Sequence, residues 1–312
     1  MSFRATLDAI ELLDSGVVDG EQVVKFLKDL GLDHVETTAV RGGKGSTDFV
    51  KMVIPGSHGK TKGEGQPTLG IIGRLGGIGA RPEMIGLVSD GDGAVSALAI
   101  GIKLARMKKC GDVLPGDVIV TTHVCPDAPT QPHDPVPFMG SPVDMDIMNK
   151  YEVDPEMDAV LSIDTTKGNR IINHKGFAIS PTVKEGYILR VSEDLLEIMS
   201  IVTGRLPATF PITMQDITPY GNGVYHVNSI LQPATATCAP CVGIAITTET
   251  AVPGCATGAS HVVDIEQVVR FAVEVAKSFG AGKCRFFDEK DFNTMVQLYG
   301  PMNHLQTLGK NC

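Results

Sequence analysis

From residue 68 onward, short runs of consecutive apolar residues alternate with longer segments whose apolar residues recur at helical spacing. A short apolar run between turn residues is typical of a strand buried on both faces, as in a mainly parallel sheet. We expect strands at residues 69–74, 118–123, 159–164, 209–214 and 242–247, and helices at residues 94–107, 193–202 and 265–279. The pattern predicts an α/β fold with an open, mostly parallel or mixed sheet and helices on both faces. It has too few strand–helix units for a closed α/β barrel.

The two ends of the chain differ from this pattern. The first thirty residues carry two amphipathic helical patterns, and strands are expected at residues 35–40 and 49–54. The other end, residues 285–312, reads as a polar tail. No internal repeat and no Pro/Ser-rich linker divides the sequence, so we expect one α/β domain over residues 1–312, with an N-terminal helical and strand segment at 1–66.

Composition narrows the classes of partner. The chain has 312 residues with 27 Lys and Arg against 36 Asp and Glu, a net charge of −9, which gives no positive field for a nucleic acid. We see no signal-peptide pattern at the start and no apolar stretch long enough to span a bilayer, so we expect a cytoplasmic protein that uses neither nucleic acid nor membrane. The apolar faces of the N-terminal helices and of the tail predict a homo-oligomer.

Seven cysteines, an odd number without an export signal, argue against a disulfide framework. Cys238 and Cys241 have the spacing of a redox pair or of half a zinc site, but no second pair completes four ligands. The alternative is that they are small apolar core residues. A thiol oxidoreductase is therefore kept as a minor hypothesis.

Ligands of open α/β sheets bind at the carboxyl ends of the strands, so polar residues that directly follow predicted strands carry most weight. The first such segment, residues 73–81, combines glycines with Arg74 and Arg81. The two arginines are suited to clamp a substrate carboxylate, or they belong to a glycine-rich turn with solvated side chains.

The second and third segments are rich in possible metal ligands. In the second, Asp90 and Asp92 lie between glycines before a predicted helix, where they either cap the helix or ligate a hard cation. In the third, prolines at residues 121–135 present His123, Asp127 and His133 on a rigid backbone, and imidazole with carboxylate suits zinc or a similar divalent ion. The alternative is a structural loop with surface histidines.

The fourth segment begins at Asp164, which ends a predicted buried strand. A buried carboxylate must be paired, protonated or metal-bound, because an isolated buried charge is very costly. Further along the chain, His226, Glu249 and His261 are candidates for the same edge of the sheet, although a lone histidine is more often structural.

Two resemblances follow from these segments. Residues 70–97, 122–145 and 158–184 are similar to a bacterial and archaeal family of proteins of unknown function, family 1177, over essentially the full length. Over residues 68–279, the order of segments also resembles the co-catalytic zinc exopeptidases of the aminopeptidase type. That resemblance assigns Asp90 to the bridging aspartate before a helix, Asp164 to a later aspartate ligand, and Asp127 to the neighbourhood of a Glu–Glu pair.

The chain departs from the exopeptidase pattern at other ligand positions. Arg74 and Gly76 stand where the first His and Asp would be, and His261 is displaced from the place of the late His. The resemblance therefore implies a rebuilt single-metal site, a metal-free site that uses Arg74, or a non-catalytic binder, rather than a two-zinc centre.

We therefore expect a metal-dependent hydrolase that acts on a peptide, an amide or a related small acidic substrate. Asp90, His123 and Asp164 would hold a divalent metal, with zinc as the first candidate, and Asp127 or His133 would be a further ligand or the base for water. Substrate binding falls to Arg74, Arg81, His226 and Glu249. The alternative is a non-catalytic or metal-free small-ligand-binding protein on a degenerate peptidase scaffold.

Overall fold

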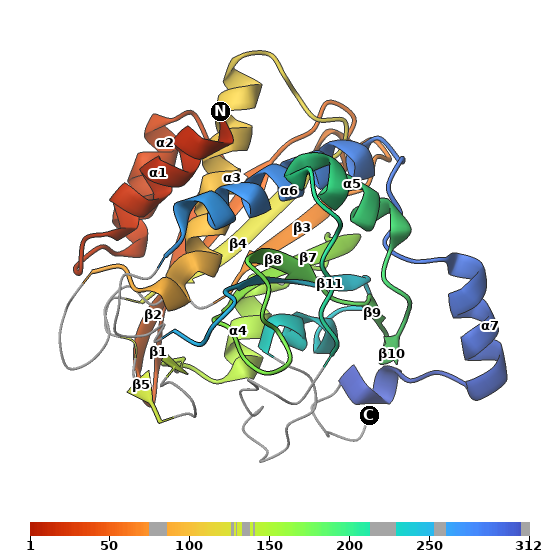
Figure 1. The fold of residues 1–312 in the computed structure, drawn as a ribbon. Coiled ribbons are helices and arrows are strands. Elements are labelled where there is room, and N and C mark those ends of the chain that lie inside the picture. Colours follow the sequence, from red (N-terminus) through yellow and green to blue (C-terminus); the bar gives the residue numbers. More distant parts are fainter. Residues whose placement is uncertain are drawn as a thin grey trace.

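The fold is known from a computed structural model, which describes residues 1–74, 86–125, 128, 130–132, 138–139, 141–212, 229–252 and 260–306. Its main element is a nine-stranded mixed sheet in the order β1-β2-β4-β3-β7-β11-β9-β10, with β8 paired to β11 (Figure 1). The strands are β1 (Val35–Gly42), β2 (Gly45–Ile54), β3 (Leu69–Gly73), β4 (Val118–Val124), β7 (Ala159–Thr166), β8 (Gly176–Ile179), β9 (Val183–Lys184), β10 (Tyr187–Ile188) and β11 (Cys241–Thr247). A separate hairpin pairs β5 (Thr130–Gln131) with β6 (Phe138–Met139).

The centre of the sheet is parallel and its margins are antiparallel. Neighbours among β4, β3, β7 and β11 run parallel, whereas β2 is antiparallel to β4 and β8 is antiparallel to β11. The parallel strands are buried along their whole length, as their apolar runs predicted. The α/β class with an open, mixed sheet is therefore confirmed.

Helices cover both faces of the sheet (Figure 1). One face carries α1 (Ser2–Leu13), α2 (Gly20–Asp29), α3 (Asp92–Lys109), α5 (Glu193–Thr203) and α6 (Val262–Gly280). The opposite face carries α4 (Met145–Glu152) and the 3₁₀ helix η3 (Ser229–Thr235). Shorter 3₁₀ helices are η1 (Lys60–Lys62), η2 (Ser89–Gly91) and η4 (Asn303–Gln306), and α7 (Glu289–Tyr299) lies to one side.

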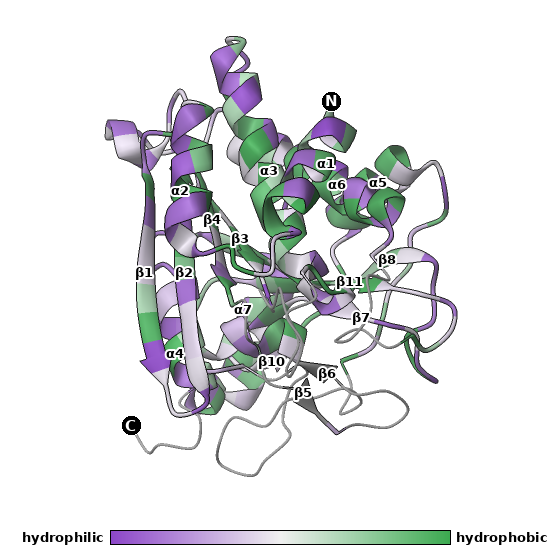
Figure 2. Cartoon of the chain, turned by 90° about the vertical axis from the view of Figure 1, so that its left-hand side faces the viewer, coloured by the Kyte–Doolittle hydropathy of each residue, from purple (hydrophilic) through white to green (hydrophobic). Residues whose placement is uncertain are grey.

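Two apolar clusters follow from the alternation of side chains along each strand. Ile71 packs into the larger cluster with α1, α3 and α6, while its neighbour Ile72 packs into the smaller one with α4 and η3. The helices of the N-terminal segment share the larger cluster with the rest of the sheet. Figure 2 shows hydrophobic stretches on α1, α3, α5 and α6, whereas β1 at the sheet edge combines hydrophilic, intermediate and hydrophobic stretches.

Two expectations differ from the structure. No strand covers the described residues 209–212, where only an isolated bridge joins Thr209 to Ile179, because Pro211 has no N–H group to continue a ladder. The tail is not only polar chain, since α7 begins at the N-cap Asp288 and buries Phe292. In the described parts of the chain, no helix is long and apolar enough to cross a membrane.

Candidate functional site

Three of the predicted residues lie at the same level of three adjacent parallel strands. Arg74 follows β3, which pairs with β4 at Ile72 and Thr121 and with β7 at Gly73 and Ile163. Continuing this register places His123 on one side of Arg74 and Asp164 on the other. All three belong to the alternate positions that face α4 and η3, and we call this row of side chains, together with its partners on those helices, the strand-end site.

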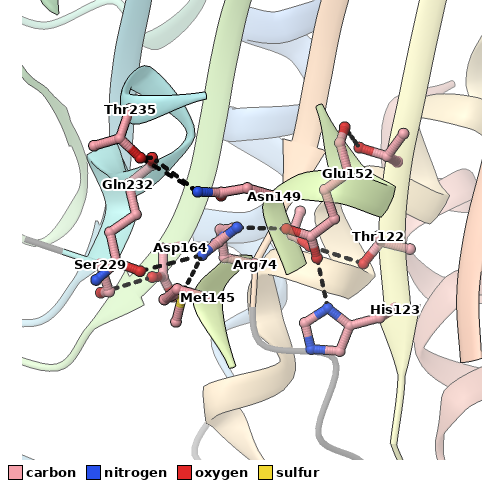
Figure 3. A network of polar contacts seen from close by, with 12 residues as sticks. Arg74, Thr122, His123, Met145, Asn149, Glu152, Asp164, Ser229, Gln232 and Thr235 are labelled. Atoms are coloured by element: carbon pink, nitrogen blue, oxygen red, sulfur yellow. Dashed lines mark hydrogen bonds and ion pairs between the residues drawn. The ribbon is translucent and has the colours of Figure 1, made fainter. Parts of the chain in front are cut away.

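The centre of the strand-end site is Glu152, the last residue of α4 (Figure 3). Its Oε2 lies 2.5 Å from Arg74 Nη1, and its Oε1 lies 2.6 Å from His123 Nδ1. Thr121 donates from Oγ1 to the main-chain oxygen of Glu152 at 2.8 Å, which fixes the end of α4 against β4. Burial alone would raise the pKa of Glu152, but the positive charge of Arg74 and the hydrogen bond with His123 outweigh it and hold this pKa below its usual range.

Arg74 is one of the largest fully buried side chains, with an exposure of 1%. Besides Glu152, its guanidinium contacts Met145 Sδ at 2.9 Å and Gln232 Oε1 at 3.5 Å (Figure 3). Its main-chain N–H donates to Ile163 O at 2.8 Å, so backbone and side chain are both held. The structure therefore places Arg74, one of the two arginines of the predicted carboxylate clamp, in an internal ion pair.

Asp164 lies on the other side of Arg74 and is fully buried. Its Oδ1 accepts the main-chain N–H of Thr165 at 2.7 Å, and its Oδ2 accepts the hydroxyl of Ser229 at 3.0 Å. Ser229 begins η3, so this bond connects β7 to the same layer that holds Glu152 and Arg74.

The segment that contains Asp90 packs on the strand ends from the α3 side of the sheet. Asp90 lies in η2, directly before α3, and is 6% exposed. Thr165, which alternates with Asp164 and faces the α3 side, donates to Ser89 O at 3.3 Å. The close fit continues at Gly93, where a Cβ atom would lie 2.3 Å from Arg74 O. The first turn of α3 therefore packs directly on the ends of β3 and β7.

A second buried ion pair lies on the α3 side. Lys167, just after β7, holds Asp92 at 2.7 Å between Nζ and Oδ2, and Ser260 hydrogen-bonds the other carboxylate oxygen. Burial raises the pKa of Asp92, although Lys167 and Ser260 act in the opposite direction. This pair joins the start of α3, the end of β7 and the segment before α6.

The remaining predicted residues have different outcomes. Glu249 lies two residues after β11 and is exposed. Arg81, Asp127, His133 and His226 lie outside the described residues. Within the part of the chain that the structure describes, no three His, Cys, Asp or Glu side chains form a group that could hold a metal ion. Asp90, His123 and Asp164 therefore do not form such a group by themselves.

The cysteine pair lies away from the strand-end site, at the amino end of β11. Cys238 is exposed, whereas Cys241 is buried, and burial raises the pKa of its thiol to about 12. A cavity of about 550 Å³ beside Cys238 is lined by Lys184 and Asp158, which also belong to the amino-end side of the sheet. A buried thiol of this kind is not suited to thiolate chemistry.

Glu152 is the site residue that sequence reasoning missed. The signal was present, because Met145, Met148, Asn149 and Glu152 follow helical spacing and are the buried residues of α4. A glutamate on the buried face of a helix needs a buried cation or a hydrogen-bond donor as its partner. In this fold Arg74 and His123 supply both.

The fold and this site define an α/β protein with a buried charged network at the carboxyl ends of its parallel strands. The chain matches, over residues 38–309, the family described as "Protein of unknown function (DUF1177)", and it belongs to that family. A comparison with curated proteins found no match.

Proposed function

We propose that the strand-end site is the active site of a metal-dependent hydrolase that acts on a peptide, an amide or a related small acidic substrate. The observation that carries the proposal is the row formed by His123 and Asp164 on either side of Arg74, with Asp90 in η2, the short helix that packs on the ends of the same strands. Asp90, His123 and Asp164 would contribute ligands, and Asp127 or His133 would complete the ligand set or act as the base. A bound divalent ion would supply a water molecule of lowered pKa.

The donor chemistry supports this proposal. A histidine that ligates a metal generally donates its other ring N–H to a carboxylate, which is the relation between His123 and Glu152. The order of segments in the zinc exopeptidases adds support, since Asp90 lies two residues before α3 and Asp164 lies near the end of β7. Because Arg74 pairs with Glu152, the acidic group of a substrate would be bound by Arg81 and His226, and Glu249 would accept a hydrogen bond from a donor group of the substrate.

A specific observation favours a second candidate, a metal-free small-ligand-binding protein. The position between His123 and Asp164 is occupied by the guanidinium of Arg74, and Lys167 neutralises Asp92 nearby. Two buried cations therefore lie among the carboxylates. On this alternative, the network shapes a binding site without turnover.

Elemental analysis separates the two candidates. The protein is purified without added metal or a metal-affinity tag, and bound zinc, manganese and iron are measured in the wild type, in Asp164→Asn and in the control Asp112→Asn, whose residue is exposed. Metal near stoichiometry that is lost only in Asp164→Asn, with chelator-sensitive hydrolysis in a dipeptide, amide and lactam screen, supports the hydrolase. No retained metal and no thermal shift with divalent ions refutes it and favours the binding protein.

We also propose a cytoplasmic homo-oligomer. Exposed apolar side chains support self-association, with Phe3 and Leu7 on α1 and Leu298 and Tyr299 on α7. Light scattering coupled to size-exclusion chromatography tests this, and a monomer at micromolar concentration would refute it.

A further inference from the structure

We propose that Glu152 is a positioning residue of the strand-end site. Its carboxylate keeps the proton of His123 on Nδ1, so that Nε2 is the nitrogen that serves as a metal ligand or as a base. In the same inference, Arg74 is the counter-ion that holds Glu152 and is not an anchor for substrate. This deepens the proposed function and rests on it for what Nε2 does, as a metal ligand or as a base. The state of His123 itself can be tested without it.

The hydrogen-bonding rules fix the tautomer. An ionised carboxylate only accepts hydrogen bonds, so the 2.6 Å contact requires that His123 Nδ1 carries the proton. Glu152 is fully buried and has a cation on its other oxygen at 2.5 Å, which favours the ionised form. In neutral His123 the remaining nitrogen, Nε2, then has a lone pair. Figure 3 shows this nitrogen on the side of the ring away from Glu152.

The carboxylate is held from several directions, as a positioning group requires. Thr121 binds the main-chain oxygen of Glu152 two residues before His123 on the same strand, which ties the carboxylate to the imidazole that it orients. Phe49 packs against the His123 ring with centroids 5.6 Å apart. Both the acceptor and the ring are therefore fixed before any ligand binds.

Arg74 completes the arrangement. Its two terminal nitrogens are divided between Glu152 on one side and Met145 and Gln232 on the other, so the contacts come from α4 and η3. At 1% exposure, the guanidinium would have to leave a buried carboxylate uncompensated before it could bind a substrate carboxylate. The geometry therefore assigns it to Glu152.

The test compares two double variants that both lack the Arg74–Glu152 ion pair. Arg74→Met/Glu152→Gln keeps an oxygen that can accept from His123 Nδ1, and Arg74→Met/Glu152→Leu removes it. Glu156→Gln, at an exposed glutamate just beyond α4, is the control for the loss of a carboxylate in this region. Because both double variants remove the two members of the Arg74–Glu152 ion pair and differ only in the residue at position 152, the comparison isolates the acceptor.

The primary measurement is nitrogen-15 NMR of the imidazole rings at neutral pH, in protein labelled at its eight histidines. His123 is assigned by the signal lost in His123→Gln. We expect the Nδ1–H tautomer in the wild type, in Glu156→Gln and in Arg74→Met/Glu152→Gln, and a shift toward the Nε2–H tautomer in Arg74→Met/Glu152→Leu. A proton on Nε2 in the wild type, or the same tautomer in both double variants, overturns the inference.

A second measurement connects the tautomer to the site. Zinc affinity by competition with a chromophoric chelator should be roughly 10- to 100-fold weaker in Arg74→Met/Glu152→Leu than in Arg74→Met/Glu152→Gln, the usual effect of removing the carboxylate behind a ligating histidine. Equal zinc affinities would overturn the ligand role of Nε2. If the tautomers behave as expected but the wild type binds no zinc and hydrolyses nothing, the proposed hydrolase fails and the positioning role of Glu152 stands.

Discussion

Replacing Arg74 by Met should destabilise the protein far more than a usual substitution, because it removes the cation from a carboxylate with no exposure to water. Glu152 is 0% exposed, and among the described residues its carboxylate would keep only the hydrogen bond with His123. Breaking one side of a buried ion pair costs about 3–5 kcal/mol, and the remaining hydrogen bond favours the lower end of that range. For 312 residues the unfolding entropy is about 0.66 kcal/mol/K, so the melting temperature should fall by roughly 5–8 °C.

The assay is urea and thermal denaturation followed by far-ultraviolet circular dichroism, since the chain has no tryptophan. Arg74→Met/Glu152→Gln should recover most of the lost stability, because the amide carries no charge that needs Arg74. The reasoning is refuted if Arg74→Met lowers the melting temperature by less than about 2 °C. It is also refuted if the double variant is no more stable than Arg74→Met, since Arg74 would then stabilise the fold by packing alone.

Three further outcomes follow from other parts of the structure. Gly93→Ala should cost about 1–3 kcal/mol in urea unfolding, because its Cβ would meet carbonyl oxygens at the ends of β3 and β7 at 2.3 and 2.8 Å, and an unchanged midpoint would contradict this packing. Burial alone would raise the pKa of Asp154, but the hydrogen bond with Lys51 outweighs it and lowers this pKa. The ionised Asp154 carboxylate therefore contributes to stability above about pH 4, and this contribution is lost as the pH falls further. Lys51→Met should reduce both the stability at neutral pH and its loss in acid, and equal acid profiles would refute the assignment. In native protein near neutral pH, iodoacetamide should label the exposed Cys238 and spare the buried Cys241, because burial raises the pKa of the Cys241 thiol to about 12. Peptide mass spectrometry measures the labelling of each cysteine, and faster labelling of Cys241 would contradict this prediction.

The parallel strands and the long helices could be predicted from the sequence because the local spacing of their apolar residues indicates which residues are buried. The runs at β3, β4, β7 and β11 are apolar on both faces, and α3 is buried nearly all round. Strands β8, β9 and β10 were missed because they are two to four residues long and take their partners from tertiary contacts. Helix α4 was missed for a similar reason, since it has only eight residues and lies just after the proline-rich segment.

The candidate site was predictable in position but not in pairing. Placing Arg74, His123 and Asp164 at strand ends needed only the order of apolar runs. That Arg74 binds Glu152 depends on α4 returning beneath β4 and β3, which spans 78 positions of sequence and leaves no local pattern. A strand-end arginine gives no indication of its partner until the packing of α4 is known, so the sequence alone favours a substrate clamp at Arg74.

The two buried ion pairs also bear on why these residues are present. Replacing a buried pair by apolar residues of similar size is often neutral or stabilising, so Arg74 with Glu152 and Lys167 with Asp92 are not needed merely to hold the core together. Yet both pairs lie at the carboxyl ends of the central parallel strands, where an α/β sheet binds its ligands. If Arg74→Met/Glu152→Leu proves as stable as the wild type but loses zinc or ligand binding, the Arg74–Glu152 pair serves the chemistry of His123 and not the stability of the fold. A large loss of stability with unchanged binding would instead make it a structural pair, and the functional site would then have to be sought elsewhere on the sheet.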